Sequence, residues 1–439
     1  MYAKPTYTIA YLFTLSLFLT QLWSFNIHAQ PNQHSRFEDW FENKALRIDY
    51  VLGGDSNSQH FYLDEVKVEQ YWSKPHSKTI DSINLGTYRV EVFDKKTGTL
   101  IYSHGFCTLF EEWQSVEEAK NIHRSFEQVT RVPLPKNEAI VTFKQRNKQG
   151  LFQELYRLPI NPNSNLTKRT PTPNINVTEI INNGHFNKKL DIAFIAEGYT
   201  TEQMEKFRSD VERLSSFLIS QKPFDKHKNN INIWAIESVS KDEGPSNPKG
   251  GVWNNTSASS SFYTFGIERY LTTLKFNRVM DIAANAPADI VYILVNSEEY
   301  GGGGIYNHYC ITTSGHNHSE NVFIHELGHG LTGLGDEYYT SDVAYQDYYP
   351  LNIEPWEPNL TTMINFENKW ADMIEKTTPI PTPAIKKHQN KVGAFEGGGY
   401  VEKGVYRPFM NCRMKSNSAN DFCPVCQAAI ERVIESYTD

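Results

Sequence analysis

Hydrophobic and polar residues alternate along the first part of the chain in short segments, a pattern typical of β-strands with one buried face. The clearest of these segments span residues 46–51, 88–93 and 139–143. Turn-forming pairs such as Gly53-Gly54 separate them. We therefore predict an antiparallel β-sandwich over residues 30–160.

Continuous apolar runs replace this alternation in the second part of the chain. They span residues 190–195, 231–236 and 289–295. Helical patterns lie between them: Thr200 and Gln203 are spaced as a capping box at the start of one helix, and a second helix is expected over residues 267–284. This order of strands and helices predicts an α/β domain over residues 189–439 with a mixed, mostly parallel sheet.

The two predicted domains are joined by residues 161–188, which are rich in Pro, Thr and Asn and contain few apolar residues. This composition is typical of a linker. Further on, the glycine run 301–304 precedes residues 306–313, which we expect to form an antiparallel strand at one edge of the sheet.

The first 29 residues have the features of an export signal. Lys4 precedes a mostly apolar run, and Ala29 ends a small-residue cleavage site. The run is interrupted by Thr and Ser and is shorter than the roughly 20 apolar residues that span a bilayer. We expect a signal peptide at residues 1–29, no transmembrane segment in the mature chain, and a secreted, periplasmic or cell-surface location. An uncleaved anchor would also place the remaining chain outside the cytoplasm.

Composition narrows the classes of partner. The 439 residues are 39% hydrophobic and 21% charged, which is enough for two domains that each bury a hydrophobic core. Lys and Arg total 43 against 51 Asp and Glu, a net charge of −8, so the chain lacks the basic surplus of nucleic-acid-binding proteins. We expect no nucleic-acid partner.

The five cysteines are an odd number, so at least one has no partner within the chain. Three of them lie near the C-terminus. We expect a structural disulfide from Cys412 to either Cys423 or Cys426, and the sequence does not decide between these two partners.

The segment His325-Glu326-Leu327-Gly328-His329 carries the strongest chemical signal. Residues four apart lie on one face of a helix, so both imidazoles can bind the same metal ion, and Glu326 can reach a water at that ion without binding the metal. Asn317 and Glu320 are spaced to cap the start of this helix.

Glycines interrupt the helical pattern directly after the second histidine, at positions 330, 333 and 335. The chain can therefore turn back and supply a third ligand. Asp336 is the predicted third ligand, and Glu337 is the alternative. Two imidazoles, one carboxylate and a water form an open catalytic site for one Zn²⁺ ion. We expect His308, His316 and His318 to be solvated loop residues rather than ligands.

These residues predict peptide-bond hydrolysis by a metal-activated water, with Glu326 as the general base. Nothing indicates a serine nucleophile or a phosphate-binding loop, because neither a Gly-x-Ser-x-Gly turn nor a Walker sequence is present.

Residues 325–338, the upstream glycine run and residues 406–414 resemble the secreted IgA peptidase family of zinc metallopeptidases. The resemblance implies a metzincin-like catalytic domain preceded by a β-sandwich. It also implies zinc-binding roles for His325, His329 and Asp336, a general-base role for Glu326, and a place for Met414 in the turn beneath the metal.

The expected substrate is an extracellular protein or peptide, and the family name adds host immunoglobulin or another glycoprotein. We expect residues 240–264 and 340–400 to form the cleft walls, and the predicted strand 306–313 to pair with substrate or within the fold. Tyr400 and Tyr406 are oxyanion-donor candidates outside the predicted catalytic set.

A second hypothesis is a non-catalytic protein that binds a surface or glycan through the β-sandwich and contains a metal-stabilised scaffold. Glu326 favours the endopeptidase, since a scaffold needs metal ligands but no acid–base group beside them.

Overall fold

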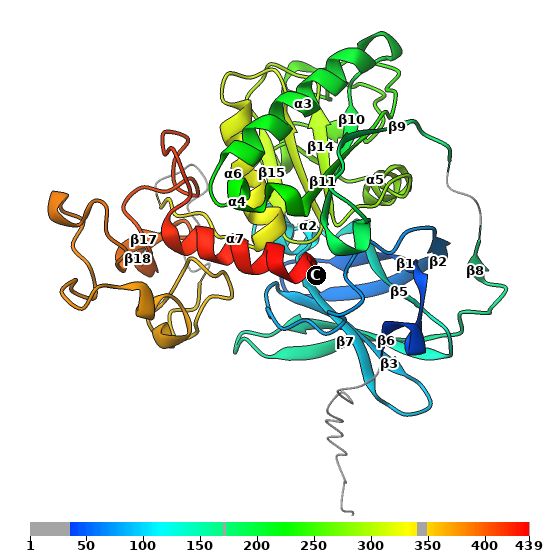
Figure 1. Cartoon of the computed structure of the whole chain (residues 1–439), viewed down its shortest axis with the longest axis horizontal. Helices are drawn as coiled ribbons and strands as arrows, with labels where there is room; N and C mark the ends of the chain where they lie inside the picture. The colour runs from blue at the N-terminus through cyan, green and yellow to red at the C-terminus, as the bar shows by residue number, and fades with distance from the viewer. Residues whose placement is uncertain (1–35, 170–172, 340–348, 439) are drawn as a thin grey trace, which may run out of the picture.

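The computed structural model describes residues 36–169, 173–339 and 349–438, which form a β-rich N-terminal part and a larger α/β part (Figure 1). The predicted signal peptide at residues 1–29 lies outside these described residues. Among the described helices, none is long and apolar enough to cross a membrane.

The N-terminal part contains two four-stranded sheets, with strand orders β5-β1-β2-β8 and β4-β3-β6-β7. The strands are β1 (Phe41–Gly54), β2 (Gln59–Glu69), β3 (Tyr88–Asp94), β4 (Leu100–Phe106), β5 (Arg124–Pro135), β6 (Ala139–Arg146), β7 (Phe152–Ile160) and β8 (Thr167–Lys168). All neighbours are antiparallel except β2 and β8. Aromatic rings join the two sheets: Phe61 of β2 stacks on Tyr156 of β7 with 4.2 Å between ring centroids.

Each of the three alternating segments identified in the sequence lies in a strand, namely β1, β3 and β6. Two short helices accompany the sheets, α1 (Phe37–Trp40) and α2 (Leu109–Gln114). Thr108 caps α2 through a hydrogen bond from the Glu111 backbone N–H. The prediction of antiparallel strands in this region is confirmed.

A six-stranded sheet with the order β15-β16-β14-β10-β11-β9 forms the centre of the α/β part. Its strands are β9 (Val177–Ile181), β10 (Leu190–Glu197), β11 (Ile231–Ile236), β14 (Ile290–Val295), β15 (Gly302–Ile305) and β16 (Tyr309–Thr313). The four inner strands are parallel, whereas β9 and β15 are antiparallel edges. The sheet is mixed and mostly parallel, as predicted.

Three sequence-based predictions of local structure are wrong. The predicted linker 161–188 contains β9, which pairs with β11 as a sheet edge. Residues 306–313 were expected to form the antiparallel edge, but that edge is the glycine strand β15, and β16 lies inside the sheet, parallel to β14. The helix predicted over residues 267–284 is only α5 (Phe276–Ala283), because Thr272–Thr273 form β13, which pairs with β12 (Ser260–Ser261).

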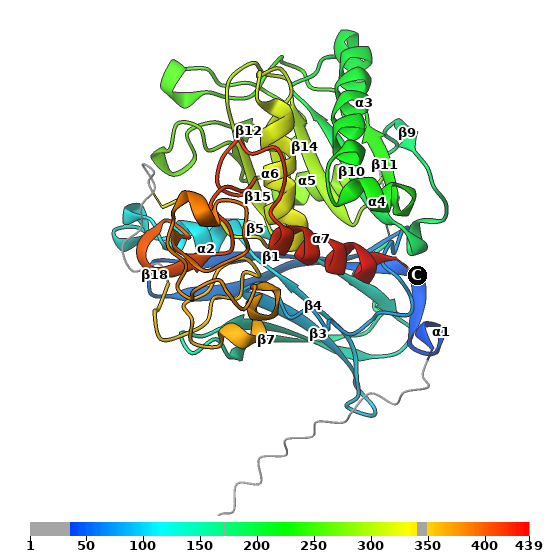
Figure 2. The same cartoon turned by 60° about the vertical axis from the view of Figure 1, so that its left-hand side comes forward.

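Side-chain alternation along the buried strands separates two cores. In β10, Ile192 and Phe194 belong to the core shared with α3 (Met204–Ser220), α6 (Ser319–Thr332) and α7 (Pro424–Tyr437). Ala193 and Ile195 face the opposite side, toward α5. The predicted Thr200–Gln203 capping box forms directly before α3. Figure 2 shows α6 and α7 between the sheet and the C-terminal loops, where the hairpin β17 (Phe395–Gly398) and β18 (Val401–Arg407) also lies.

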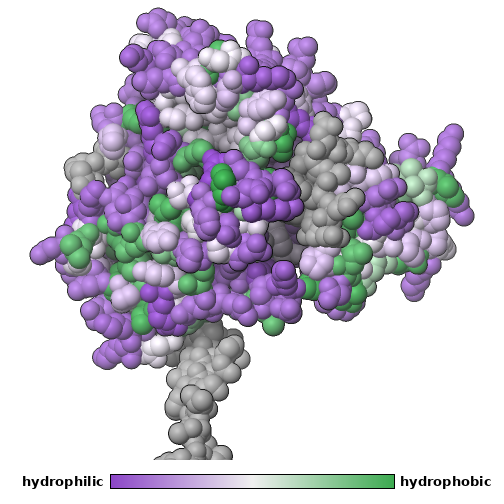
Figure 3. All heavy atoms as spheres, turned by 180° about the vertical axis from the view of Figure 1, so that it is seen from behind, coloured by the Kyte–Doolittle hydropathy of each residue, from purple (hydrophilic) through white to green (hydrophobic). Residues whose placement is uncertain are grey.

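The core on the α5 side continues into the N-terminal part, so both parts share one hydrophobic cluster. Buried polar contacts reinforce this junction. Arg47 of β1 donates to Asp281 of α5 at 2.8 Å and to the Asn277 carbonyl at 2.9 Å. The Cys107 backbone N–H donates to the Tyr306 carbonyl at 2.9 Å. The face drawn in Figure 3 is mainly hydrophilic, with small separate hydrophobic areas.

Candidate active site

Helix α6 positions the predicted metal ligands. It spans Ser319–Thr332, and its N-cap residue His318 makes no side-chain capping bond, so the predicted Asn317–Glu320 capping box is absent. Glu320 instead pairs with Arg213 of α3 at 3.1 Å. Contact with α3 therefore takes the place of the predicted capping interaction of Glu320.

The chain turns back at the end of α6, as predicted. Gly333 has a left-handed backbone conformation with φ of 63°, and its N–H donates to the His329 carbonyl. Two residues later, the Gly335 N–H donates to Asn359 Oδ1 at 2.7 Å. The reversal brings Asp336 back alongside the two histidines.

Three of the predicted site residues converge on one point. Asp336 Oδ1 lies 3.1 Å from His325 Nε2 and 3.4 Å from His329 Nε2, and the two Nε2 atoms are 3.1 Å apart. Ligand atoms about 2.1 Å from a tetrahedral ion lie about 3.4 Å apart. The separations therefore fit a single small cation. The Asp336 Oδ1 atom is buried and has no hydrogen-bond partner, as expected for a ligand atom.

Backbone carbonyls orient both imidazoles. His325 Nδ1 lies 3.0 Å from the Arg413 carbonyl, and His329 Nδ1 lies 2.5 Å from the Leu334 carbonyl. A proton on each Nδ1 leaves each Nε2 lone pair free for a metal. The Tyr400 hydroxyl donates to Asp336 Oδ2, so this tyrosine supports the carboxylate. Tyr406 is paired in β18, with its backbone bonded to Thr361.

Glu326 lies beside the histidines but farther away than Asp336. One of its oxygens lies within 4.8 Å of a nitrogen of each imidazole. The glycine strand β15 passes close to it: a Cβ added at Gly302 would lie 2.9 Å from Glu326 Oε1, and one added at Gly304 would lie 2.3 Å from its carbonyl oxygen. The absence of side chains at Gly302 and Gly304 therefore lets the strand run directly against helix α6.

The electrostatics of the site couple these groups. Burial lowers the pKa of His329, but the negative charge of Asp336 outweighs it and raises this pKa to about 9. Burial opposes ionisation of Asp336, yet the two histidines hold its pKa well below the usual value. Burial raises the pKa of Glu326, although both histidines oppose the increase. Glu326 is therefore a stronger base than an exposed glutamate.

Glu337, the alternative third ligand, faces away from the histidines. Its Oε1 accepts hydrogen bonds from Asn359 Nδ2 at 3.0 Å and from Cys426 Sγ at 3.3 Å. The expected disulfide is also absent, since the cysteines are free and Cys412 Sγ lies 3.8 Å from Cys426 Sγ. That expectation is therefore wrong.

Met414 packs against helix α6. A Cβ added at Gly328 would lie 2.8 Å from Met414 Sδ. The methionine is fully buried. Its place in a turn beneath the metal stays a prediction of the resemblance.

The histidines, Asp336 and Glu326 line a cleft of about 700 Å³. Its walls include residues that the sequence analysis missed, because they come from the other part of the chain. Glu111 and Glu112 of α2 both line the cleft, and the Tyr270 hydroxyl donates to Glu112. Burial raises the pKa of each glutamate to about 7. No local pattern in the sequence indicated this contribution.

The predicted cleft walls are partly wrong. Residues 240–264 do not line the cleft, whereas Phe265, Ile267 and Arg269 do. The predicted wall 340–400 contributes Tyr349, Trp356, Glu357 and Tyr400, and its residues 340–348 lie outside the described part.

His308, His316 and His318 were expected to be solvated loop residues, and one of the three differs from this expectation. His308 is buried against Phe276, with 3.7 Å between ring centroids, rather than solvated. It stays outside the ligand cluster, as do His316 and His318.

Two histidines one helical turn apart, a buried aspartate and an adjacent glutamate define a site of the metallopeptidase class. Comparison with protein families agrees: the family model described as IgA Peptidase M64 matches residues 178–391 and 384–434. A second model, described as Peptidase M64 N-terminus, matches residues 36–157. The chain belongs to the IgA peptidase M64 family, so it is a metallopeptidase with an additional N-terminal domain. No curated protein matches it significantly.

Proposed function

We propose that this chain is a secreted zinc endopeptidase that cleaves extracellular proteins, with His325, His329 and Asp336 as zinc ligands and Glu326 as general base. The observation that carries the proposal is the convergence of the three ligand atoms within 3.1–3.4 Å of one another. A buried nitrogen–oxygen donor set of this kind suits Zn²⁺. We further propose that the catalytic domain is metzincin-like and that the N-terminal domain is a β-sandwich.

Bound zinc would polarise the substrate carbonyl and lower the pKa of a water molecule to about 7. The chain's own residues supply the proton chemistry. Glu326, whose pKa is raised by burial, accepts the proton of the attacking water and returns it to the leaving amine. Tyr400 keeps Asp336 in position through its hydrogen bond to Oδ2.

Extended substrate would bind along the glycine strand. Gly302, Gly303 and Gly304 line the cleft beside Glu326. The inner edge of β15 pairs with β16, and its outer edge forms an isolated bridge to Tyr270 at Gly302. Backbone groups left at an open edge can pair with a peptide main chain. An extended polypeptide is therefore the substrate class that this cleft favours.

Glu326→Gln tests the proposal. The variant should keep its metal but lose about 10²–10⁴-fold in kcat/KM on an unfolded protein substrate. Glu320→Gln, at the exposed start of the same helix, is the matched control and should cleave like the parent. A chelator should abolish cleavage by the parent. Undiminished cleavage by Glu326→Gln would reject this residue as the base.

If the metal-loaded parent cut no member of a mixed peptide library, the proposed endopeptidase activity would be contradicted. The same library, when cut, gives the side-chain preference of the cleft.

A further inference from the structure

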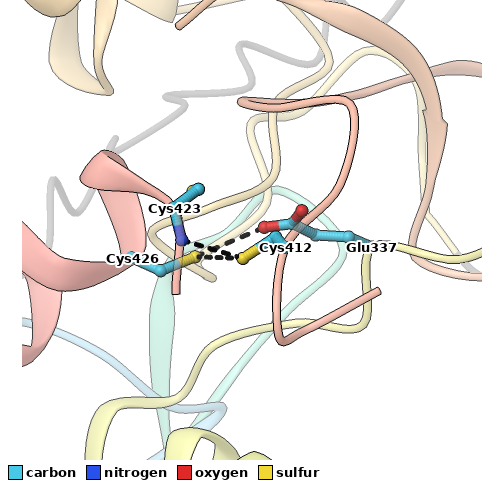
Figure 4. A group of neighbouring side chains, drawn as sticks. All are labelled: Glu337, Cys412, Cys423 and Cys426. Carbon is cyan, nitrogen blue, oxygen red and sulfur yellow. Dashed lines mark hydrogen bonds between the residues drawn. The ribbon is translucent and has the colours of Figure 1, made fainter. Parts of the chain in front are cut away.

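A second group of potential metal ligands lies beside the proposed catalytic centre (Figure 4). Glu337 follows the turn after α6, Cys412 lies in the loop after β18, and Cys423 and Cys426 lie at the start of α7. All four side chains are at most 3% exposed. One ligand atom from each lies within 4.8 Å of every other.

We propose that Glu337, Cys412, Cys423 and Cys426 form a second, structural zinc site. Three thiolates and one carboxylate make a closed tetrahedral donor set, which is the form of zinc sites that stabilise a fold. The cluster lies outside the His325–His329–Asp336 centre, so this proposal does not depend on the proposed catalytic activity.

Two ligand-to-ligand distances within the cluster fit a tetrahedral ion. Two thiolates at a Zn–S distance of about 2.3 Å lie about 3.8 Å apart, and a thiolate and a carboxylate oxygen lie about 3.6 Å apart. The Cys412 and Cys426 sulfurs are 3.8 Å apart, and Cys426 Sγ lies 3.3 Å from Glu337 Oε1. A disulfide requires about 2.05 Å between sulfurs. It would also leave the third cysteine and the glutamate buried together.

Glu337 gives a second reason to expect a cation. Its side chain is fully buried, and its Oε2 atom has no hydrogen-bond partner. No Lys or Arg nitrogen lies within 4 Å of this carboxylate among the residues that the structure describes. Ionising a buried carboxyl that has no cationic side chain beside it is costly. A metal ion at the cluster would compensate the carboxylate.

The surroundings also favour thiolates. The Cys423 backbone N–H donates to Cys412 Sγ at 3.2 Å. Cys423 is the N-cap of the 14-residue helix α7, whose N-terminal dipole stabilises negative charge. Binding of Zn²⁺ requires the three thiols and the Glu337 carboxyl to be deprotonated, with their protons released to solvent, and the loaded site carries a net charge of −2. Arg407 interacts electrostatically with Glu337, and Arg413 interacts with Cys412.

The site would hold the segments that support the catalytic centre in place. Glu337 directly follows Asp336, and its backbone N–H donates to the Met414 carbonyl at 2.8 Å. Cys412 lies two residues before Met414. A metal between these two segments would fix both the third catalytic ligand and the turn under the histidines.

Metal content tests the proposal on the full chain purified under reducing conditions. The parent should contain two zinc ions by mass spectrometry of its metals. Cys423→Ser and a His325→Ala/His329→Ala double variant should each contain one, through loss of different sites. Cys107→Ser, outside the cluster, is the matched control and should retain both. One zinc in the parent, lost entirely in the histidine double variant, would overturn the proposal.

Cobalt gives a readout on the parent, even if the cysteine variant does not fold. Loading both sites with Co²⁺ should produce the intense near-ultraviolet band of thiolate-to-cobalt charge transfer. The histidine double variant should retain this band, because its thiolate site is intact. Absence of the band from the cobalt-loaded parent, or an intact mass lower by two hydrogens that reveals a disulfide, would contradict the proposal.

Discussion

The carboxylates of the consecutive residues Asp336 and Glu337 face two different clusters. Asp336 Oδ1 lies 3.1 Å from His325 Nε2, whereas Glu337 Oε1 lies 3.3 Å from Cys426 Sγ. The turn that begins at Gly333 presents the two side chains to opposite sides. If this turn were one residue longer or shorter, a different carboxylate would face each cluster. The length of the turn is therefore a structural requirement of both clusters.

Tyr400→Phe removes the hydroxyl that donates to Asp336 Oδ2. We expect metal affinity to fall by about 10–100-fold, because partners of metal ligands orient them. Competition with a chelating indicator measures the change. Tyr406→Phe, in the same hairpin, is the control and should bind metal like the parent. Equal affinity in the two variants would contradict a supporting role for Tyr400.

Metal affinity at the histidine centre should increase with pH. The pKa of His329 in the metal-free site is raised to about 9, so both ring nitrogens of this imidazole are protonated at neutral pH. Metal must displace that proton, and affinity should rise by about tenfold per pH unit up to pH 9. Calorimetric titrations in two buffers with different ionisation enthalpies should detect the released proton. A pH-independent affinity would be inconsistent with this charge state.

Gly330→Ala should destabilise the fold by about 1–3 kcal/mol through overpacking, because its Cβ would lie 2.1 Å from Cys310 Sγ. Adding Cys310→Ala removes the clash. In urea denaturation, the double variant should lose less stability than the sum of the two single variants. If the losses in the free energy of unfolding were strictly additive, a clash between residue 330 and Cys310 would be contradicted.

The buried pair Asp191 and Asp289 should make stability fall as pH rises. Burial raises the pKa of both carboxyls, and their mutual repulsion adds to the shift of Asp191. Their contribution is therefore fully present below the unfolded-state pKa of about 4 and is lost as pH rises through the folded-state values. Asp191→Asn should flatten this dependence in thermal melts, since an amide can still accept from Trp234. Asp372→Asn, at an exposed position, is the control and should leave the pH dependence of stability unchanged.

Local patterns in the sequence were sufficient for the main strands and for the histidine cluster. The runs that became β10, β11 and β14 are apolar because both faces of the sheet are covered. The spacing of His325 and His329 and the glycines that follow them are also local features. Asp336 was identifiable for the same reason.

Features that depend on distant segments were not predictable. The thiol cluster joins residues from three separate segments, and its spacing suggested a disulfide instead. The edge strand was expected at residues 306–313, yet the glycine run before it forms the edge strand β15, because only glycine permits its approach to Glu326. Glu112 reaches the cleft from α2 through packing between domains.

The position of α2 in the cleft wall links the two parts of the chain. Substitutions at Glu111 or Glu112 alter this wall from outside the α/β part, and Glu112 also interacts electrostatically with His329 and Glu326. Evolution or engineering can therefore change the cleft and the charge around the histidine centre through the N-terminal part, without substituting any residue of α6.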